Sequence, residues 1–213
     1  MPANTKALDF QCLNCSETYQ LKSQKQLNLN KVTDGAYSAM VAALRQNAAP
    51  NLVILNYSPE WTVRNLILFP SVVFTESTLE KRNPLGEHAR RAGWTGCNIV
   101  LARIPTDAQI SVVRDSTIIP ARTVRNKYQA YRALETVQWE LRGWTLDILK
   151  LIQRIGTLEF TLDQVYAYQS ELACLHPGNR NIKAKIRQQL QTLRDLGFVA
   201  FLGSGRYHMI SRT

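Results

Sequence analysis

The stretch that decides the fold is Asp9–Lys22, DFQCLNCSETYQLK, which places two cysteines between two short segments of mixed polarity. Residue types and spacing predict strands over Ala7–Phe10 and Thr18–Lys22. The turn between them carries Cys12 and Cys15. The stretch therefore predicts a β-hairpin near the beginning of the chain.

Three polar residues of this hairpin are expected to meet on one face. Residues two apart on a strand point the same way, so Gln20 and Lys22 share a face that Asp9 reaches once the strands pair. A carboxylate and an amide carbonyl are oxygen ligands that Mg²⁺ accepts, and a lysine can steady an attacking water or the charge on a phosphoryl oxygen. The cluster predicts Mg²⁺-dependent hydrolysis of a phosphodiester. An ordinary solvated hairpin would carry the same residue types, so spacing alone leaves both interpretations open.

The composition favours a globular protein with an anionic partner. The 213 residues are 45% hydrophobic and carry a formal net charge of +10, which favours an anionic partner, most simply nucleic acid. A basic protein unrelated to nucleic acid would have the same balance. The sequence shows neither an apolar run of membrane-spanning length nor a signal peptide, and its four cysteines do not suggest a disulfide framework. We expect a soluble protein of the bacterial cytoplasm.

The first two thirds of the chain predict an α/β unit with a mixed central sheet and flanking helices. Helical spacing begins at Gly35, with Asp34 as its N-cap, and ends near Ala49. A second helix is predicted over Thr123–Arg142, ended by Gly143, where we expect the domain boundary. The expected strands are Leu52–Tyr57, Trp61–Phe69, Ile99–Ile104 and Gln109–Val113.

The remainder predicts a winged helix, so the expected domains are 1–142 and 143–213. Three helices are expected over Thr145–Ile155, Thr161–Leu175 and Asn181–Leu196, with Thr145 and Thr161 as N-caps. A β-hairpin follows at Phe198–Leu202 and Arg206–Ile210. Three helices followed by a hairpin are typical of this variant of the helix-turn-helix.

The third of these helices is basic on the side opposite its apolar stripe, which predicts contact with DNA. Its amide side chains can pair with adenine in the major groove, and the hairpin tip can reach phosphates. A plain solvated helix face is the alternative. The candidate DNA-binding residues of this unit are Arg180, Lys183, Lys185, Arg187, Gln188, Gln191, Arg206 and Tyr207.

A second candidate contact lies in Ala89–Asn98, ARRAGWTGCN. Arg90 and Arg91 can meet phosphates, and Trp94 can meet a flat base. A core tryptophan beside a surface turn would give the same composition.

Several longer strings give the chain a resemblance to the DpnI-type type II restriction endonucleases, which cut GATC only when its adenines are methylated. The resemblance covers nearly the whole chain, from about Leu8 to Tyr207. It implies an N-terminal nuclease domain of the PD-(D/E)xK class and a C-terminal winged helix, each able to bind methylated DNA. The strings are DGAY at Asp34–Tyr37, ARRAGWTGCNI at Ala89–Ile99, RGWTLDIL at Arg142–Leu149, EFTL at Glu159–Leu162 and KIRQQLQTLRD at Lys185–Asp195.

The resemblance also implies roles for single residues. Asp9 matches the metal-binding aspartate, Lys22 matches the catalytic lysine, and the backbone carbonyl of Leu21 would be a further Mg²⁺ ligand. Trp94 matches the tryptophan of the methyl-adenine pocket. Gln20 stands where relatives carry glutamate, so metal binding is expected to be weaker by the loss of one charge.

A second departure concerns zinc. Relatives carry an upstream segment with another CxxC, and a structural zinc site needs four ligands. Cys12 and Cys15 would be a partial set, so we expect that the chain lacks part of the N-terminus or has lost the zinc site. Either case would loosen the hairpin.

The predicted function is Mg²⁺-dependent cleavage of double-stranded DNA at adenine-methylated GATC by a monomer. A catalytically weakened relative that only binds methylated DNA is the first alternative. A winged-helix regulator with an unrelated sensor domain is the second, and the Asp9–Lys22 stretch argues against it.

Overall fold

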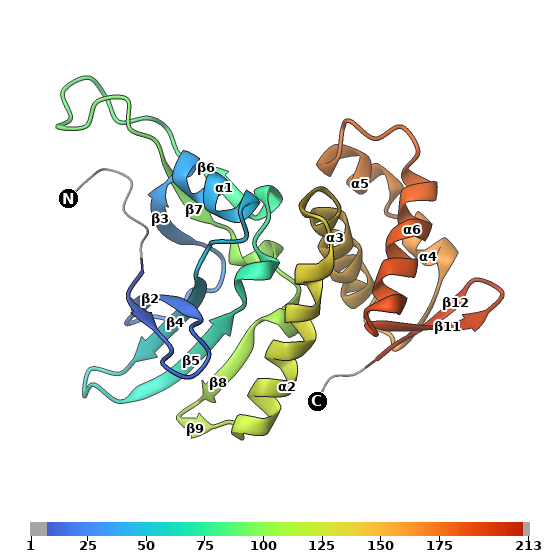
Figure 1. The fold of residues 1–213 in the computed structure, drawn as a ribbon, viewed down its shortest axis with the longest axis horizontal. Helices are drawn as coiled ribbons and strands as arrows, with labels where there is room; N and C mark the ends of the chain where they lie inside the picture. The colour runs from blue at the N-terminus through green and yellow to red at the C-terminus, as the bar shows by residue number, and fades with distance from the viewer. Residues whose placement is uncertain (1–7, 211–213) are drawn as a thin grey trace. The chain divides into compact units, whose positions relative to one another are not determined.

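The computed structural model describes residues 8–210, and the chain divides after Arg132 into two compact units (Figure 1). Each unit has its own sheet and its own buried apolar residues. The predicted combination of a mixed α/β unit and a winged helix is confirmed.

The first unit is built on a six-stranded mixed sheet with the strand order β1-β2-β4-β5-β8-β9. Strand β2 runs parallel to β4, and the other neighbouring strands pair antiparallel. The strands are β1 (Phe10–Gln11), β2 (Thr18–Gln24), β4 (Asn51–Tyr57), β5 (Val63–Phe69), β8 (Ile110–Arg114) and β9 (Thr117–Ile118).

Different elements cover the two faces of this sheet (Figure 1). Helix α2 (Ala121–Arg132) packs its Val124 and Tyr128 against Val53, Leu68 and Ile110. The opposite face meets a three-stranded sheet of order β3-β7-β6, which accompanies α1 (Tyr37–Arg45). Its strands are β3 (Val32–Ala36), β7 (Gly96–Ile99) and β6 (Leu79–Lys81), and short 3-10 turns lie at Ser71–Val73, Glu76–Thr78, Leu101–Arg103 and Thr106–Ala108.

Three predictions for the first two thirds of the chain are wrong in detail. The helix expected over Thr123–Arg142 ends at Arg132, and a 3-10 turn and a separate helix from Trp139 follow it. The strand expected over 99–104 ends at Ile99, and a 3-10 turn follows. Asp34 does not cap the first helix, because it lies in β3 and its carboxylate is engaged by side chains of β2. Helix α1 instead begins after Ala36, which makes no side-chain cap.

The second unit is a winged helix, as predicted. It begins with a 3-10 turn at Ala133–Thr136, and its sheet has the order β10-β12-β11. Helices α3 and α6 pack together through apolar residues that include Ile148, Leu190 and Leu193. The helices are α3 (Trp139–Ile155), α4 (Leu162–Tyr166), α5 (Gln169–Leu175) and α6 (Ile182–Asp195), and the strands are β10 (Glu159–Thr161), β11 (Val199–Gly203) and β12 (Arg206–Met209).

The predicted helix break at Gly143 is wrong, because α3 passes through this residue within the second unit. The buried Trp144, Leu146 and Leu149 gain more from continuous packing than the helix loses by one glycine. Thr145 is buried inside α3 rather than capping it, with its Oγ1 2.6 Å from Gln189 Oε1.

The helix predicted over Thr161–Leu175 is divided into α4 and α5, while its capping residue is confirmed. Gln164 N donates to Thr161 Oγ1, and the Gln164 side chain accepts from Thr161 N. Within residues 8–210 no helix is both long and apolar enough to cross a membrane.

Candidate functional site

The β1–β2 hairpin brings the three predicted polar residues to one face. Phe10 pairs with Tyr19, and their rings stack at 4.9 Å between centroids on the face toward α2. The neighbouring residue Asp9 donates its N–H to the Tyr19 carbonyl over 3.0 Å, so its side chain belongs to the opposite face. Gln20 and Lys22 lie on that opposite face by the alternation of β2.

Asp9 is tied to the backbone between the other two residues. Its Oδ2 accepts a hydrogen bond from the Leu21 N–H at 2.6 Å. The Leu21 N–H therefore points toward the edge of β2 that pairs with β1. The N–H and C=O of one strand residue point to the same edge, so the Leu21 carbonyl also faces the Asp9 side. The arrangement places a carboxylate beside a backbone carbonyl, the two groups to which the resemblance gives Mg²⁺, and that metal-binding role stays a prediction.

A residue that sequence reasoning did not place in the site, Asp34, completes the cluster. Its Oδ1 accepts from Gln20 Nε2 at 2.8 Å and lies 3.1 Å from Lys22 Nζ. Its side chain is only 6% exposed, and Gln20 is 5% exposed. The DGAY string contained the signal, but an acid in front of a helical pattern was interpreted as a cap.

The donors present suit a hard divalent cation. Asp9 and Asp34 offer carboxylate oxygens, and Leu21 offers a backbone carbonyl. Because Gln20 Nε2 donates to Asp34, the Gln20 Oε1 is directed away from Asp34 and can serve as a further oxygen ligand. Mg²⁺ takes oxygen ligands of these kinds and keeps several waters. The described residues therefore fit Mg²⁺ chemically.

Cys97 lies on β7 next to Asp34, and its thiol adds no charge to the cluster. It is fully buried, pairs with Asp34 across β3 and β7, and donates from Sγ to the Gly35 carbonyl at 3.6 Å. Burial, and next the negative charge of Asp34, raise the pKa of the Cys97 thiol to about 11. The thiol is therefore neutral at physiological pH and gives Asp34 an uncharged neighbour.

The turn of the hairpin carries the two cysteines predicted as a partial zinc set. The backbone N–H groups of Asn14 and then Cys15 lower the pKa of the Cys12 thiol. Cys97 lies in β7 and Cys174 in the second unit. Among residues 8–210 no group of three or more His, Cys, Asp or Glu side chains is placed to hold a metal, and the partial zinc set stays a prediction.

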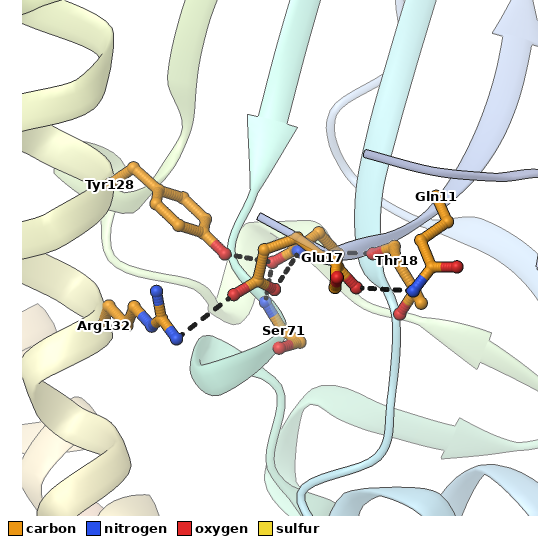
Figure 2. Close-up of polar contacts among 8 residues, drawn as sticks. Gln11, Glu17, Thr18, Ser71, Tyr128 and Arg132 are labelled. Carbon is orange, nitrogen blue, oxygen red and sulfur yellow. Dashed lines mark hydrogen bonds and ion pairs between the residues drawn. The ribbon is translucent and has the colours of Figure 1, made fainter. Parts of the chain in front are cut away.

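The base of the hairpin is held by a polar network, in which Figure 2 shows Glu17, Thr18, Ser71, Tyr128 and Arg132 close together. Asn51 Nδ2 donates to Glu17 Oε2 at 3.1 Å and to the Thr18 carbonyl at 3.2 Å. Its Oδ1 accepts from Ser71 N at 2.9 Å and from the Tyr128 hydroxyl at 3.4 Å. On its other side Glu17 Oε1 lies 3.5 Å from Arg132 of α2.

Glu17 is thus joined to β4 and α2 directly after the cysteine turn. Burial, and then the Glu17 charge, raise the pKa of Tyr128, which keeps its hydroxyl as a donor. The network fixes one end of β2, the strand that carries Gln20 and Lys22. Sequence reasoning missed it, because Asn51 is an isolated amide at the beginning of an apolar strand.

The predicted contact segment around Trp94 forms a long loop between β6 and β7 (Figure 1). Arg90 and Arg91 are exposed on it. Trp94 is half-buried, its ring would meet a Cβ at Gly96 at 2.9 Å, and its buried Nε1 has no hydrogen-bond partner within residues 8–210. Gly96 is therefore required by the close approach of the indole.

The basic face of the winged helix is exposed on α6 and directly before it. Arg180, Lys183, Arg187, Gln188 and Gln191 are all exposed. Lys185 differs, because it is half-buried, donates to Gln188 Oε1 at 2.9 Å, and has its pKa lowered by burial.

Tyr166 of α4 orders two of these cations, and sequence reasoning missed it. Its hydroxyl accepts from Arg187 at 2.8 Å, and Lys183 Nζ lies 5.0 Å from its ring centroid. In the wing Arg206 is exposed. The Tyr207 ring packs against Phe160 and Phe201, with ring centroids 5.5 and 5.2 Å away.

The fold and site define a nuclease-like α/β unit followed by a helix-turn-helix unit. Residues 1–137 match the family described as DpnI, the Dam-replacing family, and residues 140–209 match the Dam-replacing HTH domain. The chain belongs to this DpnI family, and the predicted resemblance is confirmed.

Proposed function

We propose that this protein is a type II restriction endonuclease that cleaves double-stranded DNA at GATC sites with methylated adenines. The observation that carries the proposal is the convergence of Asp9, Gln20 and Lys22 on one face of a family member's β1–β2 hairpin. The helix-turn-helix unit supports DNA as the partner.

Each residue of the hairpin has a defined task in this proposal. Asp9 and the Leu21 carbonyl bind Mg²⁺, with the Gln20 Oε1 as a weaker neutral ligand. When bound, Mg²⁺ would supply a Lewis acid at the scissile phosphate and a water of lowered pKa. Lys22 orients the attacking water and stabilises charge that develops on the phosphoryl oxygens.

The second unit binds the duplex in this proposal. The exposed cations of α6 neutralise phosphates, while Gln188 and Gln191 face adenine edges. Trp94 contacts the methyl group of adenine from the first unit. Because phosphate contacts release counterions, affinity falls as salt concentration rises.

A plasmid cleavage assay tests the proposal with methylated and unmethylated GATC in the presence of Mg²⁺. We expect cleavage of methylated plasmid only. Lys22→Ala should lose cleavage and keep DNA binding, whereas Lys25→Ala, an exposed lysine just after β2, should cut normally. Absence of cleavage of methylated plasmid, or equal cleavage of both plasmids, would contradict the proposal.

A protein that binds methylated DNA but no longer cuts it is the second candidate, and two features of the site favour it. Gln20 adds no charge to the site, and Lys22 is paired with Asp34 at 3.1 Å. Such a protein would prefer methylated over unmethylated DNA in a binding titration and leave both plasmids intact. Cleavage of methylated plasmid by the unaltered chain would exclude it.

A further inference from the structure

The glutamine at position 20 leaves the hairpin with Asp9 as its acid on the candidate catalytic face. Hard divalent cations bind more tightly as the number of carboxylate ligands increases. A second carboxylate nearby would offset the neutral amide. Asp34 is in the position to provide it.

Asp34 reaches this face from a different sheet. It lies on β3, while Gln20 and Lys22 lie on β2, and one oxygen, Oδ1, meets both of their nitrogen atoms at 2.8 and 3.1 Å. The Asp34 side chain is only 6% exposed, so its contacts with Gln20 and Lys22 lie in the interior of the unit and not on its surface. A buried carboxylate is stable there because a cation and an amide N–H both face it.

The amide of Gln20 suits this arrangement better than a carboxylate would. A glutamate at position 20 would place its oxygen where Gln20 Nε2 now donates to Asp34, and two carboxylates in contact repel. The glutamine donates instead, and its Oε1 is turned away from Asp34. Position 20 thus holds Asp34 in place.

We infer that Asp34 is the second metal-binding carboxylate of the site and that Gln20 is its positioning residue. This inference rests on the proposed function, because it assigns the charge that the proposed Mg²⁺ site needs. Asp9, directly before β1, and Asp34, on β3, would supply the two carboxylates, and Lys22 would remain free to act on the phosphate. Asp34 thus supplies a carboxylate that position 20 lacks in this chain.

Metal binding measured apart from catalysis tests the inference. Mn²⁺ affinity is determined by calorimetry for the unaltered chain, Asp34→Asn, and the double variant Gln20→Glu with Asp34→Asn. We expect Asp34→Asn to weaken Mn²⁺ binding by about tenfold or more, and the double variant to regain most of it. Asp115→Asn removes an equal charge from an exposed turn of the same unit and should bind Mn²⁺ normally.

A second measurement needs no variant. Mn²⁺ added to the unaltered chain should broaden the backbone amide NMR signals of residues 34–36 together with those of residues 9 and 21. Broadening at 9 and 21 without 34–36, unchanged affinity in Asp34→Asn, or absence of Mn²⁺ binding would overturn the inference. An unaltered chain that binds Mn²⁺ through Asp34 but cuts no methylated DNA would refute the proposed function alone. A chain that cuts while Asp34→Asn binds and cuts equally would refute the inference alone.

Discussion

Asn51→Ala should destabilise the first unit and loosen the cysteine turn more than the rest of the sheet. Asn51 is 1% exposed and joins Glu17, the Thr18 carbonyl, the Ser71 N–H and Tyr128 in one network. Each neutral hydrogen bond contributes about 1 kcal/mol, and the bond to the Glu17 carboxylate about 2 kcal/mol. The contact with Tyr128 at 3.4 Å is long and adds little. We expect a loss of about 4 kcal/mol in the free energy of unfolding.

Urea denaturation gives the loss in stability, and hydrogen exchange of residues 12–18 locates it. The matched control is Asn56→Ala on the same strand, which removes a buried amide that donates to the Gln24 and Lys25 carbonyls. Both variants should lower stability, but only Asn51→Ala should raise exchange selectively at the turn. Equal exchange at residues 12–18 in the two variants, or a loss below about 1 kcal/mol, would refute the reasoning.

Two further predictions concern Tyr166 and Cys97. Tyr166→Phe removes the hydroxyl that orders Arg187 and keeps the ring under Lys183, so DNA affinity measured by fluorescence anisotropy should fall about fivefold with an unchanged salt dependence. Tyr168→Phe, whose ring lies 4.6 Å from Arg154, is the control, and equal affinities of the two variants would contradict this role. The pKa of the Cys97 thiol is raised to about 11 in the folded protein from 9.0, so the stability that the protonated thiol contributes is complete below about pH 9 and falls by about 3 kcal/mol as pH rises through about 11. Denaturation at several alkaline pH values should show a smaller decline in Cys97→Ala, and an identical decline would show that this thiol is not the cause.

Much of the fold could be predicted because its elements carry strong local patterns. The apolar run over 52–57 predicts a buried strand, and the apolar stripe of Ile182, Ile186 and Leu190 predicts the basic helix α6 of the winged-helix unit. Gly143 misled the prediction because continuous burial of α3 outweighs the cost of one glycine. Local propensity decides such positions only where tertiary packing does not.

The candidate site could be predicted where its residues belong to one hairpin and not where they come from another sheet. Strand alternation places Gln20 and Lys22 together, and hairpin pairing adds Asp9. Asp34 stands in the shared DGAY string, but it lies on a short polar strand without an apolar period, so no periodicity identifies the strand or the face that Asp34 occupies. Its contacts depend on how two sheets pack, which a pattern along one chain does not encode.

The crossover from β2 through β3 and α1 to β4 has a consequence for how such a site can change. Every side chain in the acid–amide–lysine cluster comes from one continuous segment, 9–34. A substitution at one of these positions meets its compensating partner only 12 to 14 positions away in the sequence, so gain or loss of catalytic competence does not require changes in distant parts of the gene. The catalytic residues of this short segment can therefore change during evolution while the rest of the first unit and the winged-helix unit stay the same.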